Sequence, residues 1–100
     1  MVYAYTQDVP IDAAVYARIL EGIGPEPLDG LLVHLCTVRP EGGLRYTDVW
    51  QSEEQCAAAF SARIHPAVDA VFGGARPPSE PVVTRLDVVD LSGALVPQQA

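Results

Sequence analysis

The chain has 100 residues, a length that suits one small domain and leaves little material for a second. Its formal net charge is -7, and its basic residues are six arginines scattered along the chain, so we expect neither nucleic acid nor an anionic membrane surface as a partner. The N-terminus has no signal-peptide pattern and no segment reaches the roughly 18 apolar residues of a membrane span, which predicts a cytoplasmic protein.

Hydrophobic residues make up 49% of the chain and charged residues 19%. This is more apolar surface than a monomer of this size needs, and it indicates that another subunit covers part of it. Cys36 and Cys56 show no spacing typical of a metal or redox motif, so we expect both to be reduced and buried.

The first elements are predicted from short-range patterns. Aromatic and β-branched residues over 2–6 predict a strand. Over 11–23 the isoleucines and Val15 recur every fourth position, which predicts an amphipathic helix that ends at Gly24 and Pro25. Residues 31–39 and 44–50 predict two strands joined by a tight, glycine-rich turn.

A second helix is predicted over 53–72. Ser52 and Gln55 form a capping box at its start, and Gly73 and Gly74 end it. Pro66 lies inside this helix, where it removes a backbone hydrogen bond and predicts a kink or a restart. A last strand is predicted over 82–91, so that 1–91 form one domain and 92–100 a tail, placed at a possible dimer interface.

The resulting order β-α-β-β-α-β is that of the ferredoxin-like α+β fold, an antiparallel four-stranded sheet with both helices on one face. A sheet with one face in water alternates apolar and polar residues, but residues 31–36 are apolar almost throughout. We therefore expect the free face of the sheet to be covered by a second copy of the chain.

Two registers of the hairpin are compatible with the sequence, and they differ in the face on which Asp48 lies. A turn of residues 41–42 places Asp48 opposite Leu35 on the helix side, where a buried carboxylate is costly. A turn of residues 41–43 sorts the polar rings and this carboxylate onto the free face and is preferred. Its opposed pairs are His34 with Trp50, Cys36 with Asp48, and Val38 with Tyr46.

The preferred register predicts a shared cavity on the free face of the sheet. A mainly apolar cavity with a few convergent polar groups is the usual composition of a small-molecule site. Its expected members are His34, Tyr46, Asp48 and Trp50, joined by Tyr3 and Tyr5 from the first strand and by Arg85 from the last.

Residues 48–54, Asp-Val-Trp-Gln-Ser-Glu-Glu, are followed by a helix that contains Arg-Ile-His-Pro at 63–66. In this motif and in element order the chain resembles the dimeric α+β barrel superfamily, in its antibiotic-biosynthesis-monooxygenase-like branch. The resemblance implies a homodimer and admits cofactor-free monooxygenases of aromatic polyketides, haem-degrading enzymes, isomerases and proteins with no assigned role.

The chain departs from the haem-degrading members of that superfamily at two positions. Those members carry a histidine ten residues after the tryptophan, where this chain has Phe60, and an asparagine in the first strand, where it has only Thr6 or Gln7. Without the histidine no axial ligand for haem iron is evident, so we expect no haem, and indeed no cofactor or metal.

The expected chemistry is proton removal from a small apolar or aromatic molecule. His34 is the candidate base because its ordinary pKa suits proton abstraction at neutral pH, and Asp48 is the residue that orients it. Trp50 and Tyr46 are expected to form the walls, with Tyr3, Tyr5 and Arg85 as further substrate contacts. Two alternatives stay open: these side chains are ordinary core residues, or the dimer sequesters a ligand or has a structural role without catalysis.

Overall fold

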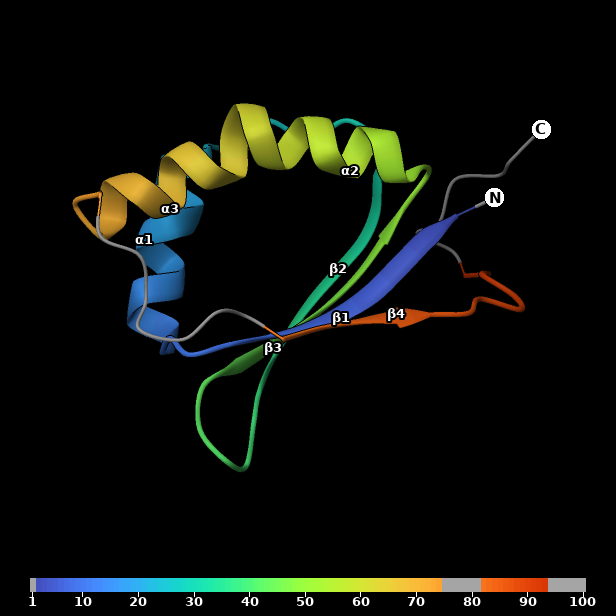
Figure 1. Ribbon diagram of the computed structural model, residues 1–100, viewed down its shortest axis with the longest axis horizontal. Coiled ribbons are helices and arrows are strands. Elements are labelled where there is room, and N and C mark those ends of the chain that lie inside the picture. Colours follow the sequence, from blue (N-terminus) through green and yellow to red (C-terminus); the bar gives the residue numbers. More distant parts are fainter. Residues whose placement is uncertain (1, 75–81, 94–100) are drawn as a thin grey trace.

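The computed structural model describes residues 2–74 and 82–93, and its elements follow the predicted β-α-β-β-α-β order (Figure 1). The strands are β1 (Tyr3–Val9), β2 (Leu31–Val38), β3 (Leu44–Trp50) and β4 (Val82–Leu86). The helices are α1 (Ala13–Ile23), α2 (Glu53–Ala59), a π-helical turn η1 (Phe60–Ile64) and α3 (His65–Val71). The predicted ferredoxin-like α+β fold is confirmed.

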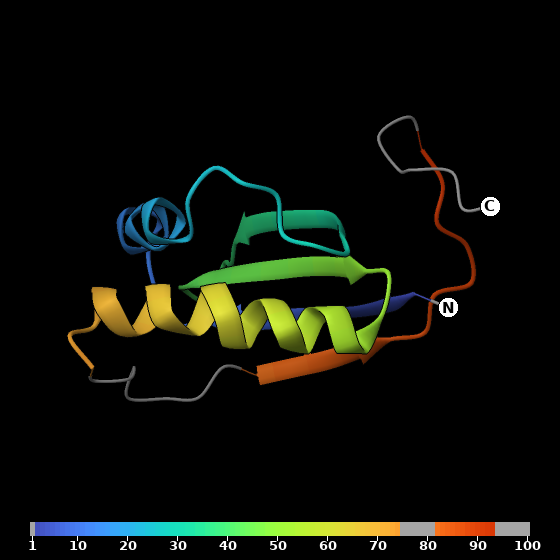
Figure 2. The same cartoon turned by 90° about the horizontal axis from the view of Figure 1, so that it is seen from above.

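The four strands form one antiparallel sheet in the order β2-β3-β1-β4. The chain crosses from β1 over α1 to the edge strand β2, and from β3 over the second helix to the other edge, β4. Both helices lie over the same side of the sheet (Figures 1 and 2). This side is called the helix face below, and the opposite side the open face.

Helix α1 begins at Ala13, two residues after the predicted start at residue 11, because Asp12 caps it. Asp12 takes extended backbone angles, and its carboxylate accepts a hydrogen bond from the Val15 backbone N–H at 2.9 Å. Ile19 is the buried residue of this helix, and Gly24 ends it by donating its N–H to the Leu20 carbonyl. Strand β1 runs three residues beyond the predicted end at residue 6, because its pairing with β3 continues to Val9.

The second helix is continuous from Glu53 to Val71 but changes its winding in the middle. The Ser52 hydroxyl accepts from the Gln55 backbone N–H at 3.1 Å, so the predicted cap is confirmed. The π turn η1 follows, in which the His65 N–H donates to the Phe60 carbonyl. Helix α3 then begins with Pro66 in its first turn, where the missing N–H costs little. The irregularity predicted near Pro66 is thus present, as a π turn within a continuous helix and not as a break.

Both hairpin registers weighed from the sequence are wrong, the preferred one by a shift of two residues. The observed pairs are His34 with Asp48, Cys36 with Tyr46, and Val38 with Leu44. The preferred register needs Pro40 to close the turn, and proline has no N–H to donate. Arg39 closes it instead, donating its N–H to the Gly43 carbonyl at 3.1 Å.

Gly43 is required at this turn for a steric reason. Its φ is +79°, and a Cβ added there would lie 2.6 Å from the Val9 carbonyl oxygen. The turn therefore packs against the end of β1, which ties the hairpin register to the centre of the sheet.

A shift of two residues preserves the side of the sheet on which a side chain lies. His34, Tyr46, Asp48 and Trp50 therefore share one face, as predicted. That face is the helix face, however, and the prediction that they point to the open face is wrong. A bulge between Leu31 and Val33 interrupts the alternation of side chains at the start of β2. Leu31 therefore lies on the helix face beside Trp50, whereas Val33 points to the open face.

The open face is apolar over its centre, and its exposed positions include Leu35 and Leu86. Ala4, Val33 and Val49 lie between them in neighbouring strands. Strand β4 ends at Leu86, whereas the prediction extended this strand to residue 91. Residues 87–91 form no strand. The expected tail 92–100 falls mostly outside the described residues, and its place at an interface stays a prediction.

Candidate functional site

A histidine and an aspartate lie directly opposite each other on neighbouring strands of the helix face. His34 of β2 and Asp48 of β3 are paired in the sheet, and the distance from His34 Nδ1 to Asp48 Oδ1 is 2.5 Å. The Asp48 side chain is 5% exposed, whereas that of His34 is 30% exposed. The carboxylate is thus sequestered, and the imidazole lies between it and the surface.

This pair explains why a carboxylate can face the helices. An unpaired buried carboxylate is costly in an apolar environment, which is why the sequence pattern favours the open face for Asp48. A charge-assisted hydrogen bond from His34 offsets that cost. The predicted association of the two residues is confirmed geometrically, and their catalytic roles stay a proposal.

The second nitrogen of the imidazole contacts a residue that the sequence analysis did not identify. The Tyr16 hydroxyl of α1 lies 2.6 Å from His34 Nε2, and the two rings are almost parallel at 18°. Tyr16 precedes the buried Ile19 by three positions, which places it on the side of α1 that packs inward. That spacing is the signal by which it could have been found.

The hydrogen-bond roles of these three side chains follow from the donors and acceptors that each one carries. A carboxylate only accepts, so His34 Nδ1 carries the proton that Asp48 binds. In the neutral imidazole Nε2 is then an acceptor, and it accepts the hydroxyl proton of Tyr16. We call the series Tyr16–His34–Asp48 the relay.

Two further side chains border the relay. The Tyr46 ring centroid lies 5.3 Å from that of His34 and 5.6 Å from that of Tyr16. Burial raises the pKa of Tyr46 and, together with the neighbouring Asp48, that of the Cys36 thiol, although the nearby Tyr16 acts in the opposite direction on Cys36. Both groups are therefore neutral at physiological pH. Tyr46 lies beside the relay, and its role as a wall for a substrate stays a proposal.

Burial also determines the protonation of Tyr16. It raises the pKa of the Tyr16 phenol to about 12, with further contributions from Cys36 and Asp48. Tyr16 is therefore a hydrogen-bond donor rather than a phenolate near neutral pH.

Trp50 and Tyr5, both predicted substrate contacts, belong to a separate buried cluster. The Trp50 indole donates to the Tyr5 hydroxyl at 3.2 Å, and that hydroxyl lies 3.7 Å from Cys56 Sγ. Trp50 is 1% exposed and Tyr5 3%. Burial, with Asp48 as the next cause, raises the pKa of Tyr5 far above its ordinary value. In the structure both are core residues, with no surface free for a ligand.

Tyr3 and Arg85 lie at the β4 side of the sheet. The Arg85 guanidinium is 5.3 Å from the centroid of the Tyr3 ring, a cation–π contact. Arg85 is opposed to Tyr5, which is opposed to Asp48, so a row of side chains crosses the helix face from His34 to Arg85. Two strands separate the ends of this row, and Arg85 is not brought to the relay.

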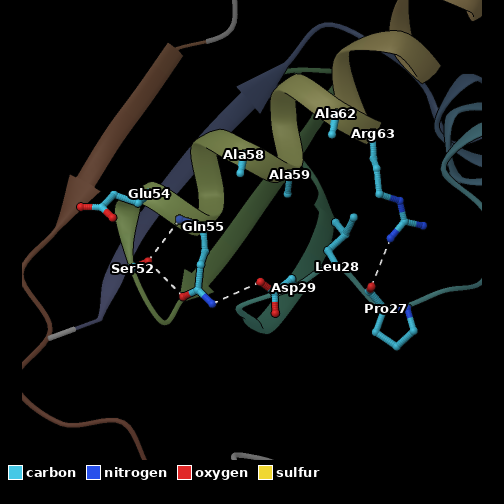
Figure 3. Close-up of a pocket in the computed structure, with 10 residues that line it drawn as sticks. All are labelled: Pro27, Leu28, Asp29, Ser52, Glu54, Gln55, Ala58, Ala59, Ala62 and Arg63. Carbon is cyan, nitrogen blue, oxygen red and sulfur yellow. Dashed lines mark hydrogen bonds between the residues drawn. The ribbon is translucent and has the colours of Figure 1, made fainter.

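The described cavities lie elsewhere. One groove of about 600 Å³ runs between α2 and the segment that precedes β2, and its lining includes Leu28, Gln55 and Ala59 (Figure 3). Arg63 is at one end, where it donates to the carbonyl of Pro27, and a second groove of about 260 Å³ adjoins it. Neither contains a residue predicted for the site.

Phe60, the residue ten positions after Trp50, contacts two other aromatic rings. Its ring centroid lies 6.3 Å from that of Trp50 and 5.5 Å from that of His65. Within residues 2–74 and 82–93 no group of histidine, cysteine and carboxylate side chains is arranged to hold a metal ion. No helix among these residues is long and apolar enough to cross a membrane.

Comparisons with known proteins agree with this architecture. No family model matches the chain, and no match was found among curated proteins. Among solved structures, Rv0793 from Mycobacterium tuberculosis is 18% identical, with 92% of this chain and 98% of that chain covered and a TM-score of 0.63. A candidate antibiotic biosynthesis monooxygenase from Chloroflexus aurantiacus is 19% identical, with coverages of 93% and 98% and a TM-score of 0.64.

A similar candidate from Deinococcus radiodurans is 13% identical, with coverages of 93% and 97% and a TM-score of 0.53. The fold expected from the resemblance at residues 48–54 is thereby confirmed: the chain shares its architecture with solved proteins described as candidate antibiotic biosynthesis monooxygenases. Identities this low carry the fold and no activity.

Proposed function

We propose that the protein binds a small, mainly apolar aromatic molecule beside His34 and begins its conversion by removing a proton. The observation that carries this proposal is the imidazole held by a buried carboxylate at 2.5 Å while it stays partly exposed. Such a step needs only protein side chains, and it is the first step of a cofactor-free oxidation or of an isomerisation.

Asp48 has two effects on a base at His34. It holds the ring orientation and the Nδ1–H tautomer, which makes Nε2 the basic atom. It also stabilises the imidazolium that forms when a proton is taken up. Tyr46, half-buried beside the imidazole, supplies a flat apolar wall for an aromatic ligand.

The proposal includes a homodimer joined through the open face. Leu35 is 53% exposed on this face and Leu86 37% exposed, and the positions between them are apolar or threonine. A surface of this kind on a small chain favours association with another apolar surface. In a symmetric dimer the open faces of the two chains cover each other, so one interface buries the apolar surface of both.

We also propose a cytosolic location. Cys36 and Cys56 are both free thiols, which is the usual state of cysteine in a reducing compartment.

A second candidate function, a ligand-sequestering dimer without catalysis, is favoured by one specific observation. The groove of about 600 Å³ lies away from the relay, so a ligand bound there would meet no base. The two functions predict different binding sites, and one ligand titration distinguishes them.

The test uses 4-nitrophenol, an aromatic acid whose anion absorbs visible light, titrated into the wild-type protein at neutral pH. We expect saturable binding with growth of the anion band, because His34 accepts the phenol proton. His34→Gln should weaken binding by tenfold or more, the equivalent of about 1.4 kcal/mol. His65→Gln is the matched control and should bind like the wild type.

Equal binding by His34→Gln and the wild type would refute the proposed site and favour the groove. Absence of saturable binding to the wild type, across a panel of phenols and hydroquinones, would refute the proposed ligand class.

A further inference from the structure

The relay leaves neither ring nitrogen of His34 open to a substrate. Asp48 occupies Nδ1 at 2.5 Å, and the Tyr16 hydroxyl occupies Nε2 at 2.6 Å. A substrate proton can therefore reach Nε2 only through the Tyr16 oxygen or after Tyr16 has moved away. The atom that ends the relay is therefore on α1 and not on the sheet.

We propose that Tyr16 is the catalytic residue that touches the acidic proton of the substrate, and that His34 acts through it. This inference rests on the proposed function and deepens it by assigning the substrate-facing group. Tyr16 lies on an element that the sequence analysis treated only as a packing helix.

The proton transfers balance without any other reagent. The bond between the substrate and its acidic hydrogen breaks, and that hydrogen bonds to the Tyr16 oxygen. The original hydroxyl hydrogen of Tyr16 moves to His34 Nε2 along the existing hydrogen bond. The products are a substrate anion, a neutral Tyr16 and an imidazolium paired with the Asp48 carboxylate. Nothing is oxidised or reduced in this step.

The alternative is that Tyr16 is a placeholder that swings aside to admit the substrate to Nε2. Contacts on the Tyr16 ring oppose this movement. Its centroid lies 5.6 Å from Tyr46 and 6.1 Å from His34, and α1 is held by packing against α3. The Tyr16 phenol can leave only if its ring contacts with Tyr46 and His34 are both lost.

The first test needs no ligand. The chain has two histidines, so the variant His65→Gln leaves His34 as the sole imidazole for nitrogen NMR. We expect the neutral ring to carry its proton on Nδ1, with a hydrogen-bonded, unprotonated Nε2. Adding Tyr16→Phe should shift the Nε2 resonance and leave the proton on Nδ1. A neutral ring protonated at Nε2 would overturn the relay.

The second test is 4-nitrophenol binding to Tyr16→Phe, which keeps the ring and removes the hydroxyl. The relay predicts binding about tenfold weaker than in the wild type, because a hydrogen bond to the bound anion is lost. A placeholder predicts unchanged or tighter binding, and either result would overturn the inference. Ser61→Ala removes an exposed hydroxyl on η1 and serves as the control.

The outcomes also separate this inference from the proposed function. Loss of binding in His34→Gln with no loss in Tyr16→Phe would leave the proposed function standing and reject the role of Tyr16. Unchanged binding in both variants would reject both.

Discussion

Trp50 and Tyr5 are joined by a hydrogen bond inside the core, where the indole Nε1–H donates to the Tyr5 hydroxyl at 3.2 Å. Trp50 is the largest fully buried side chain among the described residues. The bond links the end of β3 to β1 beneath α2, because the same hydroxyl lies 3.7 Å from Cys56 Sγ. Trp50 thus fills the core and also supplies the hydrogen-bond donor for the buried Tyr5 hydroxyl.

Trp50→Phe should lower the free energy of unfolding by about 2 kcal/mol or more, through a cavity and an unpaired Tyr5 hydroxyl. Urea denaturation measures this change. In a double-mutant cycle with Tyr5→Phe we expect a coupling of about 1 kcal/mol, since each single variant breaks the same hydrogen bond. Additive effects would show that the bond contributes nothing to stability.

Stability should fall in alkaline solution because tyrosine phenols are buried. Burial raises the pKa of Tyr16 from 10.0 to about 12, so the folded state favours the neutral phenol more strongly than the unfolded chain does. This contribution is fully present below pH 10 and is lost as the pH rises through 12. Tyr5 and Tyr46 shift in the same direction.

The measurement is the unfolding midpoint in urea between pH 8 and pH 12, expected to decline above pH 10. Tyr16→Phe should flatten part of this decline. An identical pH profile in Tyr16→Phe would contradict the assignment of this pKa to a folded-state environment.

Leu35→Glu should convert the proposed dimer to a monomer, because it replaces an exposed apolar side chain of the open face by a charge that the interface would bury. Leu20→Glu on α1 is the matched control, since Leu20 is 45% exposed and Leu35 is 53% exposed. Sedimentation equilibrium at micromolar concentration measures both. A monomeric wild type would reject the dimer, and a Leu35→Glu dimer would locate the interface elsewhere.

Gly22→Leu should destabilise the packing of α1 against α3 by about 1–3 kcal/mol. A Cβ at Gly22 would lie 3.1 Å from the Cβ of Ala67, which is 5% exposed, so a larger side chain forces the helices apart. Glu21→Leu, at an exposed neighbouring position, is the control for added apolar volume. Equal unfolding free energies in the two variants would contradict a tight crossing.

Local patterns were sufficient for the elements and for the fold. The period of the isoleucines, the Ser52 cap, Pro66 and the glycine-rich turn each act within a few residues of the chain, so they could be interpreted without a structure. The grouping of His34, Tyr46, Asp48 and Trp50 on one face also followed, since side-chain alternation in a strand is local.

The register depends on one local and one distant feature. Arg39 closes the turn because Pro40 has no N–H, which is local, and Gly43 packs against the end of β1, which is distant in sequence. Asp48 faces the helices because His34 compensates its charge, which no count of apolar and polar residues could indicate.

By itself the sequence determined an antiparallel α+β sheet and the grouping of His34, Tyr46, Asp48 and Trp50 on one of its faces, because these depend on periodicity. It placed Leu31 on the same face as Val33, and the bulge between them separates the two. Only the tertiary structure decided that Tyr16, 18 residues before His34, completes the relay, and that Trp50 is core and not wall. The physical reason is that a hydrogen bond between a helix and a strand depends on the docking angle of the two elements, which packing of the whole chain determines.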